Sequence, residues 1–450
     1  MTITVICIAI NARIMKFYNR EKEIKLLHSI EKKSIQAAQM TFVVGRRRIG
    51  KTSLLAKAYQ EHTMLYFFVA KKNESLLCQE FVQEIRNKLQ VEIFGELKTF
   101  KSVFGYLMEL SKTMHFTLII DEFQEFKTIN PSIYSDMQNS WDSQKDQSKI
   151  NLILCGSVYS LMSRIFEHSK EPLFGRATGR IHLKEFTIST LKEILIDYHK
   201  EFNNEDLLAF YLITGGVAKY VELLVQENAF SIDHILNVVL SDNSLFLDEG
   251  RNVLIDEFGK EYGNYFSILS LIASSKTSRL EIESIMEMQV GGFLDRLENE
   301  FGIISKVRPI FAKPSSRSVK YHIKDNFLNF WFRFIYKYRS AVEIGNFDFL
   351  KKIINRDYNT FSGPILEKYF IEKMKQEGNY SNIGTYWEKG NQNEIDIVAL
   401  NELDKSIIYG EVKRNKKNIS LGVLEKKTEK LQSKFSDYQA KYIGLSIEDM

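Results

Sequence analysis

Short, mostly apolar runs alternate with helical segments in the first 185 residues. Residues 41–44, 116–120 and 151–155 are rich in β-branched and aromatic side chains, and each is followed by glycine or acidic residues. Strands of a parallel sheet are buried on both faces and give such runs. The pattern predicts an α/β domain over residues 15–185, with functional residues at the carboxyl ends of its strands.

The remaining chain is predicted to form three further domains. Residues 186–255 have helical periodicity, as in Leu191–His199 and Leu207–Leu212. Residues 256–340 contain three short helical runs followed by two strand-like runs at 303–307 and 319–323, the order of a winged helix-turn-helix. Residues 341–450 contain two strands, a helix over 424–435 and a last strand near 441–446. We expect an α/β fold for this last domain.

The predicted third helix of the winged helix is poorly suited to DNA. It carries Arg296 but also Asp295, Glu298 and Glu300. An interdomain packing module is therefore at least as good an interpretation as a DNA reader. The aromatic run Asp325–Phe334 is typical of a buried core rather than of a base-stacking surface.

Composition indicates an ordinary globular protein whose charge is unevenly placed. The 450 residues carry a net charge of +4, with 44% hydrophobic residues. Between Lys413 and Lys441, nine Lys or Arg residues stand against three Asp or Glu residues. Such a run is usually a solvated face, and the alternative is contact with a polyanion.

Cysteine usage and the absence of long apolar runs favour a soluble protein of a reducing cytoplasm. Cys7, Cys78 and Cys155 lie far apart and suggest neither disulfides nor zinc. The apolar start, residues 1–14, is too short to span a membrane and lacks the features of a signal peptide. We expect it to be a start-site extension before a natural start at Met15.

The most specific motif follows the first strand. It is a G-x-x-x-x-G-K-[ST] loop between a strand and a helix, a pattern that binds nucleoside triphosphates. Glycines let backbone amides point at phosphate oxygens, the lysine reaches the β and γ phosphates, and the threonine hydroxyl binds Mg²⁺. The predicted ATP-binding residues of this loop are Gly45, Arg46, Arg47, Arg48, Ile49, Gly50, Lys51, Thr52 and Ser53.

Two acids end the strand at 116–120. Asp121 is predicted to hold Mg²⁺ with Thr52, and Glu122 to polarise the attacking water. Ser157 follows the third strand and is predicted either to sense the γ-phosphate or to cap a helix. Arg176 is a candidate for stabilising transferred phosphate, from its own subunit or a neighbour, and a surface ion pair is its alternative.

These motifs resemble the archaeal-type AAA+/STAND ATPases that carry a C-terminal domain similar to PD-(D/E)XK nucleases. The resemblance rests on Phe17–Glu23, the arginine-rich loop 45–52, Ile120–Gln124, Gly156-Ser157, Phe174–Arg176 and Thr214–Tyr220. It implies that Asn19–Glu23 lies near the adenine and that residues 186–255 form a helical lid. Ala218 departs from the family, which usually has proline there.

The C-terminal domain contains a pattern similar to the D-x(n)-E-x-K pattern of that nuclease fold. Asp396 lies on one predicted strand, and Glu411 and Lys413 share one face of the next. The two carboxylates can bind Mg²⁺ or Mn²⁺ and activate water for phosphodiester hydrolysis, and Lys413 would stabilise charge or help to position that water. Glu367 resembles the upstream acid of the fold, and Glu394 is a further candidate ligand. An exposed hairpin with inactive acids is the alternative.

Together the motifs predict a Mg²⁺-dependent ATPase switch coupled to a nuclease-like domain acting on nucleic acid, with DNA favoured. A nucleotide-dependent homo-oligomer is expected, and no membrane partner. One alternative is a signalling switch with a catalytically inactive C-terminal binding domain. Another is a DNA-binding regulator that acts through the winged helix.

Overall fold

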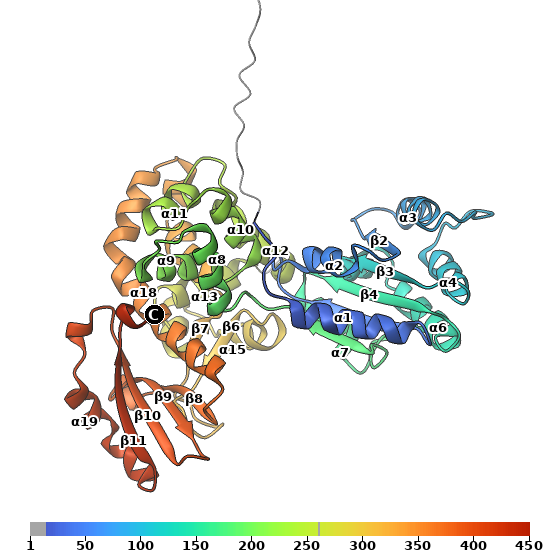
Figure 1. The fold of residues 1–450 in the computed structure, drawn as a ribbon. Helices are drawn as coiled ribbons and strands as arrows, with labels where there is room; N and C mark the ends of the chain where they lie inside the picture. The colour runs from blue at the N-terminus through green and yellow to red at the C-terminus, as the bar shows by residue number, and fades with distance from the viewer. Residues whose placement is uncertain (1–14, 260–261) are drawn as a thin grey trace, which may run out of the picture. The chain divides into compact units, whose positions relative to one another are not determined.

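The computed structural model describes residues 15–259 and 262–450 of the chain. These residues divide into two compact units (Figure 1). Residues 19–185 form the first unit, and residues 186–450 form the second together with the segment that ends at Tyr18. The predicted tail, residues 1–14, lies outside the described residues.

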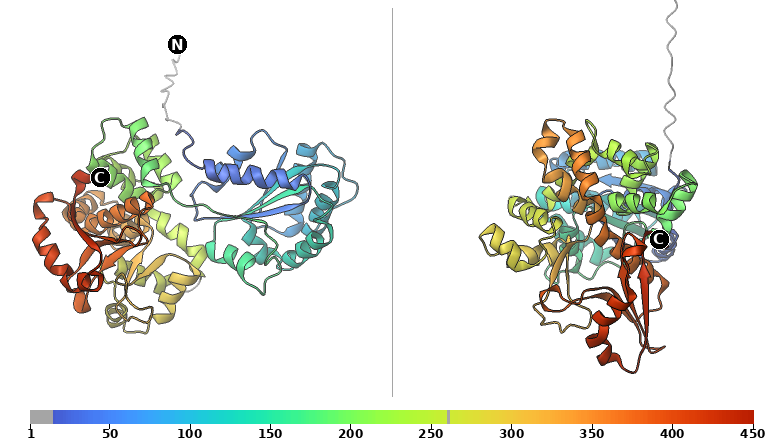
Figure 2. Two further views of the ribbon diagram at one scale, coloured as in Figure 1. Left: turned by 60° about the horizontal axis from the view of Figure 1, so that its bottom comes forward. Right: turned by 90° about the vertical axis from the view of Figure 1, so that its left-hand side faces the viewer.

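The first unit is a five-stranded parallel sheet covered by helices on both faces (Figure 2). The strand order is β2-β3-β4-β1-β5. The strands are β1 (Gln39–Val44), β2 (Met64–Phe68), β3 (Phe116–Asp121), β4 (Ile150–Gly156) and β5 (Gly179–His182). The helices are α1 (Glu21–Ser34), α2 (Lys51–Tyr59), α3 (Glu74–Leu89), α4 (Phe100–Leu110), the 3₁₀ turn η1 (Phe123–Glu125), α5 (Phe126–Ile129), α6 (Ile133–Gln144) and α7 (Tyr159–Glu167).

Alternating side chains of the central strands pack into two separate cores. In β1, Phe42 and Val44 belong to one core, whereas Val43 belongs to the core on the opposite face. This explains why the strand reads as a continuous apolar run. The predicted parallel α/β sheet is confirmed, and β4 lies between β1 and β3.

The second unit begins with five helices, of which α9 is the most deeply buried. They are α8 (Ile188–Tyr198), α9 (Asn204–Thr214), α10 (Ala218–Gln226), α11 (Ile232–Val239) and α12 (Leu245–Phe258). Every residue of α9 from Asp206 to Thr214 is buried. Asn203 and Asp206 form a capping box that satisfies amides at the start of this helix.

Three helices and a hairpin follow in the order that the sequence predicted. They are α13 (Tyr262–Ala273), α14 (Arg279–Met286), α15 (Gly291–Asp295), the π-helical η3 (Arg296–Glu300), and strands β6 (Ile304–Val307) and β7 (Lys320–Ile323). The two strands pair antiparallel, with Ile304 opposite Ile323. The assignment of this module to the winged-helix class stays a prediction.

The predicted aromatic run forms part of the core of this unit. It covers α16 (Asn326–Phe330) and the π-helical η4 (Trp331–Tyr336), and the short α17 (Arg339–Glu343) follows. Phe327, Trp331 and Phe332 are buried, and the indole Nε1 of Trp331 donates a hydrogen bond to the carbonyl of Leu247. The run therefore stabilises packing, as expected from its composition.

The C-terminal region is a four-stranded sheet between two helices. The strand order is β11-β10-β9-β8, in which only the β10–β11 pair is parallel. Its elements are α18 (Phe347–Glu377), β8 (Asn382–Tyr386), η5 (Lys389–Asn391), β9 (Ile395–Asn401), β10 (Ser406–Val412), η6 (Lys416–Asn418), α19 (Leu421–Gln432), η7 (Ser433–Phe435), β11 (Gln439–Leu445) and η8 (Ile447–Asp449). Leu424 and Leu431 of α19 pack on one face of the sheet, and α18 contacts β8, β9 and β10.

One hydrophobic core runs through the second unit from α8 to the last residues of the chain. The predicted limit at residue 185 coincides with the division between the units, and the predicted limits at 255 and 340 fall inside the second unit. Within the described ranges, none of the helices combines the length and the apolar character that a bilayer crossing requires.

Candidate functional site

The loop between β1 and α2 has the backbone that its two glycines permit. Gly50 has φ 96°, a left-handed conformation, and it immediately precedes the first residue of α2. A Cβ at Gly45 would lie 2.7 Å from the carbonyl oxygen of Leu183, so only glycine fits there. The loop therefore curls tightly at the N-terminus of α2, where amides and the helix dipole favour an anion.

Lys51 is buried and folded back over this loop. Its Nζ donates hydrogen bonds to the carbonyls of Gly45 (2.8 Å) and Arg46 (3.2 Å). Burial lowers the pKa of Lys51, while the nearby carboxylates of Glu122 and Asp121 oppose that shift. The ammonium is thus held at the loop by weak carbonyl contacts that phosphate oxygens would replace.

Asp121 ends β3 beside the loop. Its Oδ2 accepts hydrogen bonds from the Thr52 hydroxyl (3.3 Å) and from the Tyr66 hydroxyl (2.5 Å). A carboxylate and a hydroxyl within reach of each other match the oxygen ligands that Mg²⁺ prefers, with the remaining positions open to water and phosphate. These residues fit a magnesium ion.

Glu122 is held by two polar side chains on neighbouring elements. Its Oε2 accepts hydrogen bonds from Gln124 Nε2 (2.5 Å) and from Ser157 Oγ (2.7 Å). Glu122 itself has φ 54°, an uncommon conformation for a side-chain-bearing residue. Ser157 follows β4, so the serine reaches the acid because β4 is the strand next to β3.

Gln124 is buried, with 1% of its surface exposed, and it lies against Gly156. Its Oε1 has no hydrogen-bond partner among the described residues. A Cβ at Gly156 would lie under 3.0 Å from that oxygen and from the Met162 side chain. The glycine at the end of β4 therefore makes room for the amide that holds Glu122.

The other predicted residues of the first unit occupy different surroundings. Ile49 is fully buried and anchors the loop, while Arg47 and Ser53 are exposed and Arg46 and Arg48 are partly buried. Arg176 forms a two-pronged ion pair with Asp142 and donates to the carbonyls of Pro172 and Phe174. The structure brings Lys51, Thr52, Asp121, Glu122 and Ser157 together, and it engages Arg176 in a separate surface ion pair.

Sequence reasoning did not assign a role to Tyr66 or Gln124. Tyr66 lies in β2, and only the β2–β3 pairing brings its hydroxyl to Asp121. Gln124 lies two residues after Glu122, a spacing that gives no signal of contact by itself. Its place in the Ile120–Gln124 motif, two residues beyond the Asp121–Glu122 pair, was the available indication.

Comparison with known proteins identifies the family of the chain. Residues 17–224 match a family model described as an ATPase domain predominantly from Archaea. An uncharacterised protein of Methanocaldococcus jannaschii is 30% identical over 406 residues, which cover 88% of this chain and 87% of that relative. The chain belongs to this family of archaeal ATPases. Residues 331–432 of this chain match a second model, for archaeal and bacterial proteins of unknown function.

The chain is also similar to solved structures. The Walker-type ATPase PABY2304 of Pyrococcus abyssi has a TM-score of 0.54 at 18% identity and covers 70% of this chain and 96% of its own. The ORC2 protein of Aeropyrum pernix, solved with ADPNP and ADP, has a TM-score of 0.47 at 13% identity and covers 74% and 96%. At these identities the first likeness establishes a shared fold only.

The predicted C-terminal constellation is also brought together. Asp396 Oδ2 accepts hydrogen bonds from the Val412 amide (2.8 Å) and Lys413 Nζ (3.2 Å). Lys413 Nζ lies 3.7 Å from Glu411 Oε1, and Lys427 Nζ lies 3.3 Å from the same oxygen. Lysine ammonium groups therefore neutralise both carboxylates in this structure.

Glu367 of α18 belongs to the same charged cluster. Burial and, next, the negative charge of Asp396 raise its pKa to about 8, while Lys413 opposes the rise. A carboxyl with that pKa is mainly protonated at neutral pH. In the described part of the chain, no group of three His, Cys, Asp or Glu side chains is arranged to hold a metal ion. The predicted second metal site, at Asp396, Glu411 and Glu367, is therefore not supported.

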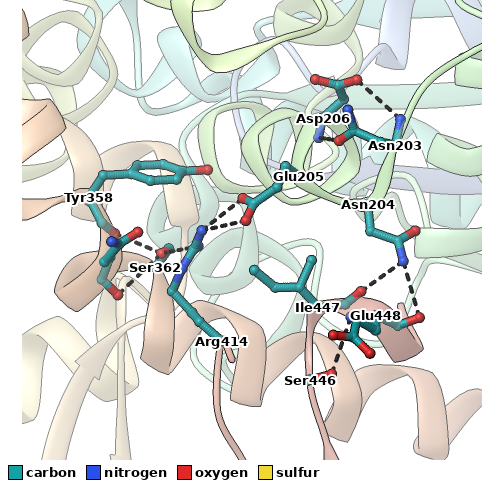
Figure 3. A network of polar contacts seen from close by, with 11 residues as sticks. Asn203, Asn204, Glu205, Asp206, Tyr358, Ser362, Arg414, Ser446, Ile447 and Glu448 are labelled. Atoms are coloured by element: carbon teal, nitrogen blue, oxygen red, sulfur yellow. Dashed lines mark hydrogen bonds and ion pairs between the residues drawn. The ribbon is translucent and has the colours of Figure 1, made fainter. Parts of the chain in front are cut away.

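The residue after Lys413 joins the C-terminal sheet to helix α9 (Figure 3). Arg414 Nη2 donates to both carboxylate oxygens of Glu205 (2.7 and 2.8 Å), and Nη1 donates to Ser362 Oγ (2.7 Å). The guanidinium also lies over the Tyr358 ring, 5.1 Å from its centroid. Nearby, the Asn204 amide donates to the carbonyl of Ile447 at 2.7 Å. The end of β10 is thus fixed to the first turn of α9 and to α18.

Proposed function

We propose that this protein binds and hydrolyses ATP with Mg²⁺ and uses the nucleotide state as a switch. The observation that supports this most is the convergence of Lys51, Thr52, Asp121 and Glu122 at one edge of a parallel sheet, beside the N-terminus of α2. Membership of the archaeal ATPase family agrees with this proposal.

Each residue has a physical role in the proposal. Amides of residues 45–52 cradle the phosphates, and Lys51 neutralises the β and γ phosphates. Thr52 and Asp121 hold Mg²⁺, which supplies positive charge to the phosphates. Glu122 orients and polarises the attacking water, and Ser157 holds Glu122 or senses the γ-phosphate from the end of β4.

Two variants test this site. Lys51→Ala should abolish ATP binding, because it removes the buried ammonium that would neutralise the β and γ phosphates. Glu122→Gln should bind ATP normally and hydrolyse it about a hundredfold or more slowly, because an amide cannot accept a proton from water. Lys57→Ala, an exposed lysine of the same helix, is the matched control and should leave both properties unchanged. Normal turnover in Glu122→Gln would remove that residue from the mechanism.

Arg176 remains a candidate for action between subunits. Its ion pair with Asp142 is on the surface, where exchange for another anion costs little. An oligomer formed with ATP would let Arg176 contact a neighbour's phosphate. Mass measurement by light scattering, with and without a slowly hydrolysed ATP analogue, tests oligomer formation. If mixing Arg176→Ala with Lys51→Ala restores turnover that neither variant has alone, the residue acts between subunits, because an intact Arg176 of one subunit then serves the intact loop of another.

A second candidate function belongs to the C-terminal sheet. Asp396, Glu411 and Lys413 lie together, and the resemblance of their sequence pattern to nuclease-like domains favours action on nucleic acid. The lysine bridge between the carboxylates and the protonated Glu367 weigh against a resident metal. The alternatives are therefore a cleaving domain and an inactive nucleic-acid-binding domain.

Cleavage assays separate these two alternatives. Single-stranded and duplex DNA and RNA are incubated with Mg²⁺ or Mn²⁺ and with wild type, Asp396→Ala or Lys413→Ala. Loss of cleavage in both variants supports the nuclease-like proposal. Equal activity in all three proteins excludes this site as its source, and Lys417→Ala, an exposed lysine outside the cluster, serves as the control.

A further inference from the structure

The β6–β7 hairpin carries a concentration of positive charge that the proposed functions do not use. Between Phe301 and Lys324 the sequence has no Asp or Glu. The basic residues of this segment are Lys306, Arg308, Lys313, Arg317, Lys320 and Lys324. The net positive charge of this segment contrasts with the acidic third helix, which ends at Glu300. We refer to residues 304–324 as the basic hairpin.

Most of these charges are not neutralised. Among the described residues, no carboxylate forms an ion pair with Lys306, Arg308, Lys313 or Arg317. Lys313 and Arg317 are exposed, and Lys306 and Arg308 are partly buried. The Nε atom of Arg308 is buried and has no hydrogen-bond partner in the described structure. Uncompensated positive charges repel one another, so their close spacing favours an anionic partner.

The long connection of the hairpin is attached to the C-terminal sheet. The amide of Ile310 donates to the carbonyl of Thr385 in β8 at 2.8 Å, and the Ile310 side chain lies in the core formed by β9, β10 and α19. The indole Nε1 of Trp387 donates to Ser318 Oγ at 2.9 Å. The Phe311 ring packs on Phe435, with 4.8 Å between centroids. Both ends of the connection are therefore fixed, and the segment does not project as a free wing.

This attachment places the basic hairpin beside the carboxylate cluster. Lys320 Nζ pairs with Glu394 at 2.7 Å and lies 4.5 Å from the centre of the Trp387 ring. Glu394 and Lys320 also act on the pKa of Glu367. On the other side, the contact of Phe311 with Phe435 brings the connection next to the exposed Lys434, which follows the basic helix α19. Lys434 therefore extends the positive charge of the hairpin to the end of α19, where Lys427 and Lys430 pair with Glu411 and Glu388.

We propose that the basic hairpin and α19 form one surface that binds the phosphate backbone of a nucleic acid. This inference rests on the proposed action of the C-terminal region on nucleic acid and names the surface that makes the contact. A row of charges fixed on a rigid sheet matches the regular spacing of backbone phosphates. An anionic membrane fits less well, because the hairpin presents no amphipathic helix whose apolar face would enter the bilayer.

The inference changes the role of the winged-helix-like module. Its acidic third helix would not enter a groove, and Arg296 lies over the rings of Tyr265 and Phe293. The module would instead contribute its hairpin to a surface shared with the C-terminal sheet. Because contacts to phosphates carry no sequence information, such a surface would bind nucleic acid with little sequence preference.

The test measures binding of the full-length protein to a labelled 20-mer, single-stranded or duplex, by fluorescence anisotropy in EDTA at several salt concentrations. The variant is Lys313→Gln with Arg317→Gln. The matched control is Lys25→Gln with Lys33→Gln, two exposed lysines of α1 that remove the same charge. Thermal unfolding of both doubles should match wild type, because all four side chains are exposed.

We expect the hairpin double to weaken binding about tenfold to a hundredfold near 0.1 M salt and to reduce the slope of log K against log salt by about 2. The control should retain wild-type binding. Equal losses in both doubles, an unchanged slope in the hairpin double, or preferential binding to phosphatidylserine vesicles would overturn the proposal. ATP binding measured on the same proteins keeps the two proposals apart, because Lys51→Ala should still bind the 20-mer.

Discussion

Gly156→Ala should impair the candidate ATPase site without touching a residue that contacts nucleotide. The new Cβ would lie under 3.0 Å from Gln124 Oε1 and from the Met162 side chain, both of which are buried. Gln124 must then move, and its hydrogen bond to Glu122 Oε2 is lost or lengthened. The substitution therefore changes the position of the Glu122 carboxylate while its chemical identity stays the same.

Two magnitudes follow from this geometry. Overpacking a well-packed core costs about 1–3 kcal/mol of folding free energy. A hydrogen bond to a charged group contributes about 1.5–3 kcal/mol. If that contribution holds Glu122 in the transition state, turnover should fall roughly ten- to a hundredfold, since about 1.4 kcal/mol corresponds to a factor of ten. ATP affinity should change little, because the loop and Lys51 are untouched.

The assay combines steady-state ATP hydrolysis, ATP binding and thermal unfolding. Gly105→Ala is the matched control, because a Cβ there meets no atom within 4 Å and Gly105 lies inside helix α4. That control should keep full turnover and gain slight stability from the higher helix propensity of alanine. Wild-type turnover and wild-type melting temperature in Gly156→Ala would refute the reasoning.

Three further predictions concern other parts of the chain. Glu367 keeps its proton up to about pH 8 in the folded protein but loses it near pH 4.5 when the chain is unfolded. The free energy of unfolding should therefore fall as pH rises between these values, by at most about 1.4 kcal/mol per pH unit. Glu367→Gln should lack this fall in melting curves from pH 5 to 9 in EDTA, and parallel pH profiles for both proteins would contradict the assignment. Arg414→Ala should lower the free energy of unfolding by about 1–3 kcal/mol, because it leaves Glu205 and Ser362 without the guanidinium that donates to them. The control Arg356→Ala, at an exposed arginine, should change that free energy by less than about 0.5 kcal/mol. Equal effects of the two variants in denaturant titrations would exclude a role for the Arg414 network. Tyr66→Phe should alter the Mg²⁺ concentration required for half-maximal hydrolysis, because Asp121 loses a hydrogen-bond donor. An unchanged magnesium titration would show that this contact does not affect magnesium binding.

The nucleotide-site residues were predictable because their signal is local. Gly45, Gly50 and Lys51 lie within seven residues, and their loop lies between a strand and a helix that the sequence also indicates. Asp121 and Glu122 directly end an apolar strand, and parallel strands share the edge at which they end. The arrangement of the first unit follows from these rules, except that they do not give the order of the strands.

The contacts that the sequence did not predict join segments that are distant along the chain. Tyr66 reaches Asp121 only through the pairing of β2 with β3, and Ser157 reaches Glu122 only because β4 is the strand next to β3. The sequence left Arg176 as either a phosphate contact or a surface ion pair, and only the structure identifies Asp142 as its partner. The attachment of Ile310 to Thr385 joins segments that no local pattern connects, although the absence of acids from the basic hairpin was visible in the sequence.

The C-terminal constellation shows a different limit. Asp396, Glu411 and Lys413 come together as the D-x(n)-E-x-K pattern predicted, because strands β9 and β10 pair. The pattern does not determine the pKa of the neighbouring Glu367, which burial and the charge of Asp396 raise and Lys413 lowers. A sequence motif therefore locates this cluster more securely than it assigns its chemistry.

The central claim is that the loop at residues 45–52 binds ATP with Mg²⁺. Isothermal titration of purified protein with a slowly hydrolysed ATP analogue in Mg²⁺ tests it most directly, with Lys51→Ala and Lys57→Ala measured in parallel. We expect saturable binding of one nucleotide per chain in wild type and Lys57→Ala, and none in Lys51→Ala. No heat of binding in wild type, or equal binding in Lys51→Ala, would contradict the account.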